Sequence, residues 1–237
     1  MAFKHGKDTV VFLDNTEYSS YMNSLDLSRT ADVAESTVFG KDSKTYIVGQ
    51  KDGVASATGF WDSTMDAQLA TLLGQASNSL LVIGTGGIAA TDGCSFGNIR
   101  ETNYGESSPV GDIVAFSVDF QSDNGLYNGS ILENATYTAT VSGTARDNTL
   151  STANGGAGFL IVSSASGTSP TADIKITHSA DNSTYADLVT FTQATSATSE
   201  LVQVAKGTTV NRYLKVEATI GGTNPSFSAI IGFGRNN

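Results

Sequence analysis

The stretch that decides the fold is IVAFSVDFQS, residues 113–122. Every second residue is apolar, and the apolar members are Val114, Phe116, Val118 and Phe120. The residues between them are small or polar: Ala115, Ser117, Asp119 and Gln121. A period of two residues predicts a β-strand with one buried face and one polar, partly acidic face.

Residues 23–33 repeat this pattern. Leu25, Leu27 and Val33 are the apolar members, and the polar members are Asp26, Ser28, Thr30 and Asp32. The chain is rich in Gly and Ser/Thr and has only 3 Pro, which is typical of a mainly β protein. Further strands are expected at residues 9–13, 45–48, 54–61, 80–83 and 97–104, with a loop at 34–44 and a hairpin turn at Lys51-Asp52-Gly53.

One helix is expected, at residues 64–73. Ser63 is a suitable N-cap, and Gly74 provides a stop after the last turn. The apolar residues at helical spacing are Met65, Leu69, Leu72 and Leu73, which predicts one apolar side that lies on a sheet.

The second part of the chain contains short predicted strands at regular intervals. They cover residues 159–163, 172–178, 188–192, 201–204, 212–218 and 227–233. This spacing favours a β-sandwich, of the jelly-roll or immunoglobulin-like type. We therefore expect a first domain at 1–142, a Gly-, Thr- and Asn-rich linker at 143–157 and a second domain at 158–237.

The charge is divided unevenly along the chain. Residues 1–145 carry 7 Lys/Arg and 17 Asp/Glu, a net charge of −10, and residues 146–237 carry 6 of each, a net charge of zero. Such an acidic part repels polyanions instead of binding them. The chain has no apolar run near 18 residues and no visible secretory signal, so we expect a soluble protein made in a cytoplasm.

Catalytic and metal-binding patterns are weak. A Ser–His–Asp arrangement through His178 and Asp181 is less plausible than a surface histidine at a strand end. Cys94 is the one cysteine, so an intrachain disulfide is excluded and a zinc site has little support. The Gly84-Thr85-Gly86-Gly87 run lacks the ending of a phosphate-binding loop. We expect no enzyme, no metal and no cofactor.

An ordered set of segments resembles the major tail protein, or tail tube protein, of long-tailed bacteriophages (siphophages). The segments are AFKHGKDTVVFLD (2–14), SRTADVAESTVFGKDSKTYIVG (28–49), VASATGFWD (54–62) and SSPVGDIVAFSVDFQSD (107–123), with the predicted helix among them. The resemblance implies a sandwich-like β-domain with one flanking helix. It also implies six-membered rings whose inner sheets join into a continuous barrel, and stacking of the rings through a long loop and an amino-terminal arm.

This resemblance implies two sets of site residues. The polar strand faces would line the lumen through Asp26, Thr30, Asp32, Asp119, Gln121 and Asp123. Basic groups near the predicted loop and turn would contact the next ring, with Lys41, Asp42, Lys44, Lys51 and Asp52 as the contact residues. The alternatives are ordinary solvated residues on a monomer and a solvated loop.

In the second domain, a Ser-x-Asp-x-Ser-x-Tyr turn (Ser179 to Tyr185) and an Arg-Tyr-Leu-x-Val strand (Arg212 to Val216) resemble discoidin-like jelly rolls. This resemblance implies an outer decoration domain with candidate glycan contacts at Tyr185 and Arg212. Core aromatics and turn residues are the preferred alternative.

The expected partners follow from the tail-tube resemblance. They are further copies of the chain, a tape measure protein and a tail terminator. Double-stranded DNA would pass through the tube without specific binding. Host-surface glycans are candidate partners of the second domain. The expected location is the virion, after assembly in the bacterial cytoplasm. A carbohydrate-binding adhesion protein and a head-decoration or head–tail joining protein are the alternatives, and a hydrolase comes last.

Overall fold

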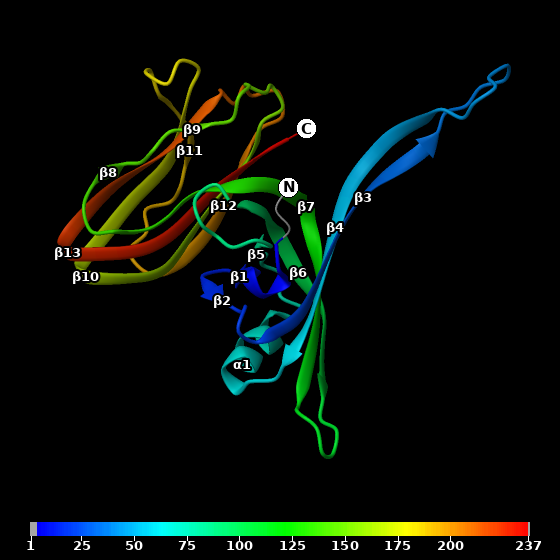
Figure 1. Ribbon diagram of the computed structural model, residues 1–237, viewed down its shortest axis with the longest axis horizontal. Coiled ribbons are helices and arrows are strands. Elements are labelled where there is room, and N and C mark those ends of the chain that lie inside the picture. The colour runs from blue at the N-terminus through cyan, green and yellow to red at the C-terminus, as the bar shows by residue number, and fades with distance from the viewer. Residues whose placement is uncertain (1–3, 237) are drawn as a thin grey trace. The chain divides into compact units, whose positions relative to one another are not determined.

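The computed structural model describes residues 4–236, so Ala2 and Phe3 of the quoted opening segment lie outside the described residues. The fold is mainly β with one α-helix, as the sequence predicts. The elements are η1 (Gly6–Asp8), β1 (Val10–Leu13), β2 (Thr16–Glu17), β3 (Met22–Glu35), β4 (Tyr46–Phe60), α1 (Ser63–Leu72), β5 (Ser79–Gly84), β6 (Gly93–Ser107), β7 (Ala115–Tyr137), β8 (Val141–Ser142), β9 (Arg146–Asp147), β10 (Gly156–Ser179), β11 (Ala186–Thr190), β12 (Thr198–Val204) and β13 (Tyr213–Arg235) (Figure 1).

The chain forms two compact units that are not continuous in sequence. Unit 1 contains Met1–Ser19, Leu80–Phe96 and Tyr127–Asn237, and unit 2 contains Ser20–Ser79 and Gly97–Leu126. These boundaries differ from the expected division at 142/143. Residues of the predicted linker 143–157 also form β9 and the start of β10. The physical reason is that β1 and β5 pair with each other and share a core with the later strands. These contacts join segments that are distant in sequence, so the local composition does not predict them.

Unit 1 is built on a ribbon of two long antiparallel strands, β10 and β13, paired from Gly156–Arg235 to Ser179–Tyr213. One half of β10 pairs also with β12, and the other half pairs with β11. Likewise β7 flanks one half of β13, while β8 and β9 flank the other. The strands expected at 159–163 and 172–178 are therefore one strand, as are those at 212–218 and 227–233, because bulges absorb the turn-forming residues between them.

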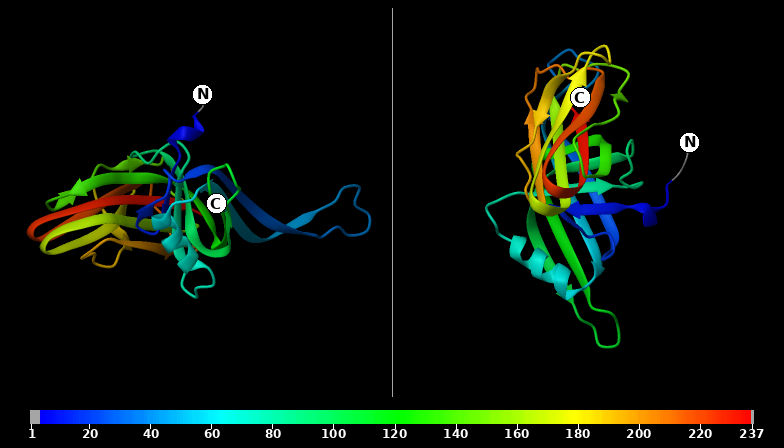
Figure 2. Two further views of the ribbon diagram at one scale, coloured as in Figure 1. Left: turned by 90° about the horizontal axis from the view of Figure 1, so that it is seen from below. Right: turned by 90° about the vertical axis from the view of Figure 1, so that its left-hand side faces the viewer.

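The ribbon folds over at its middle, where its register shifts (Figures 1 and 2). Gly167 and Gly222 have φ values of +118° and +105° there, a region that favours glycine. A Cβ on Gly167 would lie 2.7 Å from the Asn224 carbonyl oxygen, and one on Gly222 would lie 2.7 Å from that of Ser169. The close approach of the two strands at the bend thus requires glycine on both.

The folded ribbon encloses the main core of unit 1. Side chains from both halves meet in it: a Cβ on Gly158 in the first half would lie 2.9 Å from Cδ1 of Ile176 in the second. The most buried members include Leu160, Ile174, Val216, Phe227 and Ile231. A second core joins β1, β5 and the start of β6 to the first half of the ribbon through Val82, Phe96, Ile131, Phe159 and Ile161. This is a β-sandwich arrangement, as expected for the carboxy-terminal part.

Unit 2 is a sheet in the order β3-β4-β7-β6 with one helix beside it (Figures 1 and 2). Buried and exposed residues alternate along β4 and β7, so one face is apolar and covered. Its buried members are Ala55, Ala57, Phe116, Val118 and Phe120. The strand pattern predicted from residues 113–122 is confirmed, and the pairing extends it to Tyr137.

The expected hairpin turn at Lys51-Asp52-Gly53 is wrong. These residues lie inside β4, which is one strand of 15 residues paired with β3 in antiparallel register. The chain reverses instead through residues 36–45, the region expected as a loop. Pairing with β3 on both sides of the Lys-Asp-Gly sequence overrides its local tendency to turn.

Helix α1 begins one residue earlier than expected. Asp62 is its N-cap, and the Asp62 carboxylate accepts a hydrogen bond from the Thr64 N–H. Gly74 follows the helix with φ of +77°, the conformation expected for a glycine stop. Met65 and Leu69 are buried, whereas Leu73 is 47% exposed, so the apolar side is narrower than the sequence predicts.

Candidate functional site

The uncovered face of unit 2 brings two of the predicted acidic residues into one row. Asp26 on β3 pairs in register with Ser56 on β4, and Ser56 pairs with Asp119 on β7. Directly opposite residues of antiparallel strands project from the same side of a sheet. The two carboxylates, which are 93 residues apart in sequence (119 − 26), therefore lie on one polar face with a serine between them.

Asp119 is held in its ionised form. The side chains of Ser56 and Asn103 donate hydrogen bonds to its carboxylate and hold its pKa below the usual range. The Asn103 Nδ2 lies 3.0 Å from the Asp119 Oδ2. In contrast, the Asp26 carboxylate has neither a hydrogen bond nor an ion pair within residues 4–236, and the residue is exposed. Asp119 therefore supplies negative charge to the polar face at neutral pH.

The polar row continues toward the free end of β4. Thr30 is in register with Asp52, and Val54 is in register with Gln121. The Gln121 Nε2 donates to the Asp52 Oδ1 at 2.6 Å, and the Ser122 Oγ donates to the same oxygen at 3.3 Å. Asp52, expected in a contact turn, is therefore attached to the sheet and belongs with the polar face.

Two further predicted residues of this set have different surroundings. Asp123 accepts a hydrogen bond from Asn78 at 2.6 Å and lies 3.6 Å from the Arg100 guanidinium, so its charge is partly balanced. Asp32 is exposed and lies within the register shift between Ala31 and Val33, outside the part of β3 that pairs with the β7-paired residues of β4. The strand register thus groups Asp26, Asp119 and Gln121 in the polar row, and it does not group Asp32 or Asp123 with them.

One strand at the margin of the unit 2 sheet lacks a second partner among the described strands. β3 pairs with β4 alone among the described strands. The last strand of unit 2 on the other side is β6, of which residues 97–107 belong to this unit; β6 pairs with β7 and also with β5. An unpaired strand edge presents backbone N–H and C=O groups that another chain can pair with.

The β3–β4 hairpin extends past the sheet as a two-stranded arm, which we define as residues 29–51 (Figure 1). Pairing of β4 with β7 covers only Val54–Phe60, so the arm has no strand beside it within the described part of the chain. Lys41 and Asp42 lie in its loop, and Lys44 lies 2.9 Å from Glu35. Lys51 is exposed in β4, so the predicted basic residues are spread along the arm instead of forming one tip.

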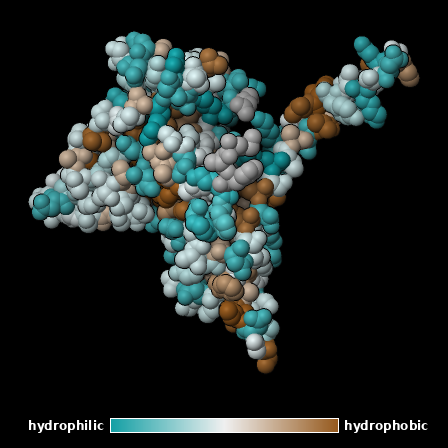
Figure 3. Space-filling view, in the orientation of Figure 1, coloured by the Kyte–Doolittle hydropathy of each residue, from teal (hydrophilic) through white to brown (hydrophobic). Residues whose placement is uncertain are grey.

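Sequence reasoning missed the apolar character of the arm. Six large apolar side chains on it are more than half exposed: Val33, Val38, Phe39, Tyr46, Ile47 and Val48 (Figure 3). Phe39, in the loop, is fully exposed. The sequence does contain a signal for these side chains. It is the pair of apolar runs Val38-Phe39 and Tyr46-Ile47-Val48, which lie close together in the chain. An isolated two-stranded ribbon is marginal in water, so this surface is suited to a protein partner.

The predicted glycan contacts in unit 1 are already engaged. The Lys215 Nζ lies 4.0 Å from the centre of the Tyr185 ring, and Arg212 binds Asp147 through two nitrogens. The pair lowers the pKa of Asp147 to about 2. The Ser-x-Asp-x-Ser motif forms a turn in which Asp181 accepts hydrogen bonds from Ser179, Ser183 and Thr184.

The weak catalytic arrangement through His178 is not assembled. The His178 Nδ1 accepts a hydrogen bond from the Asn211 N–H at 3.2 Å, whereas Asp181 is used in its own turn. Burial raises the pKa of the Cys94 thiol to about 12, so this thiol is not an activated nucleophile. Within residues 4–236, no group of three or more His, Cys, Asp or Glu side chains is arranged to hold a metal ion. No helix in the same range has the length and apolar character of a membrane span.

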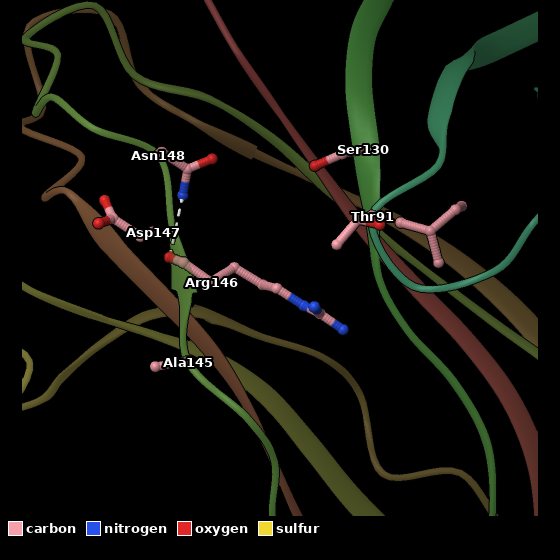
Figure 4. A pocket seen from close by; sticks show the side chains of 7 residues that line it. Thr91, Ser130, Ala145, Arg146, Asp147 and Asn148 are labelled. Carbon is pink, nitrogen blue, oxygen red and sulfur yellow. Dashed lines mark hydrogen bonds between the residues drawn. The ribbon is translucent and has the colours of Figure 1, made fainter. Parts of the chain in front are cut away.

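A cavity of about 330 Å³ lies in unit 1 (Figure 4). Thr91 and Ser130 line it together with residues 145–148. The Arg146 Nε donates to the Leu132 carbonyl at 3.3 Å, and Asp147 is bound by Arg212. These charged side chains are therefore tied into the sandwich and do not form a pair of reactive groups facing each other.

An acidic cluster joins α1 to β6 in unit 2. The Tyr104 hydroxyl donates to the Asp66 Oδ1 at 2.6 Å and lowers the pKa of Asp66. Burial raises the pKa of Glu101 to about 7, and neither of its carboxylate oxygens has a hydrogen-bond partner in the described part of the chain. Glu101 is 6% exposed. We therefore expect the stability of unit 2 to depend on pH through Glu101.

Comparisons with known proteins identify distant structural similarity. No family model matches the sequence, and no curated protein matches it. Among solved structures, one similar chain comes from the virion of a native gene transfer agent particle. It is 14% identical to this chain, and the TM-score is 0.45. The match covers 52% of this chain and 97% of that chain. The SPP1 Dit (gp 19.1) protein, described as a paradigm of the hub adsorption apparatus in phages that infect Gram-positive bacteria, is 12% identical, with a TM-score of 0.41, 97% of this chain covered and 99% of that chain.

A third similar structure is the tail of an empty gene transfer agent particle with C6 symmetry. It is 10% identical, with a TM-score of 0.44, 52% of this chain covered and 97% of that chain. All three TM-scores lie below 0.5, so these similarities assign neither a fold family nor a function to this chain.

Proposed function

We propose that this chain is a virion structural protein, a tail tube subunit that assembles into stacked rings around a conduit for DNA. The single observation that supports this most is the architecture of unit 2. Its sheet has a helix and an apolar layer on one side, an acidic polar face on the other, and strand margins that can pair with further copies. The resemblance of the four segments between residues 2 and 123 to tail tube proteins supports the same function.

Ring closure would use the strand margins. If the β3 margin of one copy pairs with the β6 margin of the next, the sheets become one barrel and no edge remains exposed. A closed ring of identical subunits removes the aggregation hazard of open edges. In this proposal the ring is a hexamer, as the resemblance implies.

The acidic polar face would then line the lumen. Duplex DNA carries a negative charge roughly every 1.7 Å of its axis, so lysines on the wall would hold it at many places. Carboxylates such as Asp26 and Asp119 repel it instead, and screening limits this repulsion to about 8 Å at physiological salt. The wall would act as a non-adhesive surface without a binding site for DNA.

The first test is negative-stain microscopy of the purified chain over a range of protein concentrations. Rings or long hollow tubes are the expected result. A chain that stays a monodisperse monomer at all concentrations would contradict the proposal, and it would shift support to a carbohydrate-binding or adhesion protein.

The lumen role predicts an effect of reversing one charge. Asp26→Lys should slow DNA ejection from particles that carry it, because each subunit then offers a cation to the passing phosphates, and the delay should shrink at high salt. Asp26 is chosen because its side chain has no hydrogen bond or ion pair within residues 4–236, so we expect its replacement to spare the fold. Ejection is measured by the release of DNA into a fluorescent dye.

The matched control is Asp173→Lys, an exposed position in unit 1 that changes the net charge by the same amount. Asp26→Asn should have a smaller effect than Asp26→Lys. Equal ejection rates for Asp26→Lys and Asp173→Lys, in particles with normal tails, would mean that Asp26 does not face the DNA.

A further inference from the structure

The cavity of unit 1 is lined by polar groups that take no part in holding the fold together (Figure 4). Its volume of about 330 Å³ lies at the lower end of the range for small-molecule sites, roughly 300–1,000 Å³. The hydroxyls of Thr91 and Ser130 have no hydrogen-bond partner within residues 4–236. Asn148 donates from its side-chain nitrogen to backbone carbonyls, and its side-chain oxygen has no partner in the same range. Three groups that can bind a hydroxyl-bearing ligand therefore line one small cavity.

Arg146 adds a positive charge to this lining. Its Nε donates to the Leu132 carbonyl at 3.3 Å, which holds the side chain against β7. Its two terminal nitrogens have no hydrogen bond or ion pair within the described part of the chain. Figure 4 shows the guanidinium reaching from β9 toward β7 and the loop that precedes β6. The neighbouring Asp147 is bound through both of its carboxylate oxygens by Arg212, so it does not neutralise Arg146.

The loop that carries Thr91 has a backbone conformation that threonine disfavours. Thr91 has a φ of +85°, which is uncommon for a β-branched residue. Two backbone hydrogen bonds hold it there: its N–H donates to the Ile131 carbonyl at 2.9 Å, and the Ile131 N–H donates to the Asp92 carbonyl at 2.9 Å. Residues in such strained conformations gather at ligand sites. The conformation keeps Thr91 on the cavity at some cost to stability.

We propose that this cavity binds a sugar acid, which is a monosaccharide that carries a carboxylate. The two terminal nitrogens of Arg146 match the two oxygens of a planar carboxylate. One guanidinium balances one negative charge, which favours a carboxylate over a doubly charged phosphate. The hydroxyls and the Asn148 oxygen then bind hydroxyls of the sugar. The site requires neither the proposed tube nor Tyr185 and Arg212, the glycan contacts that the discoidin-like resemblance implies.

Saturation-transfer NMR titration of the full chain tests this site, because it detects weak binding to a monomer and to an assembly alike. The probes are glucuronate, galacturonate and N-acetylneuraminate, with glucose as the uncharged sugar and inorganic phosphate as the anion without a sugar. At least one sugar acid should bind about ten-fold more tightly than glucose or phosphate. Arg146→Gln should weaken that binding by about ten-fold or more. The matched control is Lys206→Gln, which removes an exposed positive charge of unit 1 outside the cavity lining and should leave the affinity unchanged.

Two further variants keep the test valid if Arg146→Gln does not fold. Ser130→Ala should weaken binding of the sugar acid without changing the urea midpoint of unfolding. Thr91→Gly should also weaken it, yet leave the midpoint unchanged or higher, because glycine removes the hydroxyl and accepts the positive φ. No binding of any of the three sugar acids, equal affinity for glucose, or full affinity in both Ser130→Ala and Thr91→Gly would overturn the proposal. None of these results bears on whether the chain forms tubes.

Discussion

At the scale of single residues, the stability of unit 2 responds to pH through Glu101. This side chain is buried in β6 without a hydrogen-bond partner in residues 4–236, and burial raises its pKa from 4.5 to about 7. A raised carboxyl pKa means that the folded state binds the proton more tightly than the unfolded state. Its contribution to stability is therefore complete below pH 4.5 and is lost as the pH rises toward and through 7.

Replacing Glu101 by glutamine should remove this loss, because glutamine is neutral at every pH. Relative to the unmodified chain, the free energy of unfolding of Glu101→Gln should rise by about 3 kcal/mol between pH 4 and pH 8. Urea unfolding at the two pH values measures it. Glu106→Gln, at an exposed carboxyl on the same strand, is the control and should show a smaller change. A difference between Glu101→Gln and the unmodified chain that stays the same at both pH values would contradict this account.

At the scale of elements, the bend of the β10–β13 ribbon depends on backbone space more than on side-chain chemistry. Gly222 combines a positive φ with the nearby Ser169 carbonyl, whereas Gly207 has a φ of +93° and open space, with nothing within 4 Å of the point that a Cβ would occupy. Substituting the two glycines therefore distinguishes two contributions to the loss of stability. Gly207 reports the effect of the positive φ alone, and Gly222 reports that effect together with the close contact between the strands.

Alanine substitution at these glycines should give unequal losses of stability. Gly207→Ala should cost about 1 kcal/mol for the left-handed conformation. Gly222→Ala should cost about 1–3 kcal/mol more, because its Cβ would force the two strands of the bend apart. Urea unfolding of both variants provides the comparison. Equal losses would mean that the bend tolerates a wider separation of its strands.

At the scale of the whole molecule, the exposed arm should distinguish a free chain from an assembled one. Trypsin should cut the free chain early after Lys41, which lies in the arm's exposed loop without an ion pair in residues 4–236. Assembly should protect this site, because the arm is then covered by a neighbouring copy. Mass spectrometry of the early fragments reports the site of cleavage.

Lys206, an exposed lysine in unit 1, is the internal reference for this measurement. The ratio of cleavage at Lys41 to cleavage at Lys206 should fall when the protein polymerises. An unchanged ratio in preparations that microscopy shows to be polymeric would place the arm outside the contacts between subunits.

The local pattern of the chain was enough to predict several features. The alternation in residues 113–122 predicts one apolar and one acidic strand face, and β7 has both. The N-cap and stop residues around 63–74 predict α1 to within one residue. These features depend on neighbours two to four positions away, which set strand and helix periodicity. The uneven charge is likewise a property of the chain that can be counted without a fold.

Other features required the folded arrangement. The register that aligns Asp26, Ser56 and Asp119, the continuity of β4 through Lys51-Asp52-Gly53 and the union of residues 80–96 with the late strands all arise from pairing between distant segments. Many strand pairings are possible, and the one that forms is determined by backbone hydrogen bonds and burial across the whole fold. No short stretch of the sequence is enough to predict it. The exposure of the apolar side chains on the arm is a further example. The sequence contains the apolar run Tyr46-Ile47-Val48, but only the pairing of the other strands shows that no strand covers it.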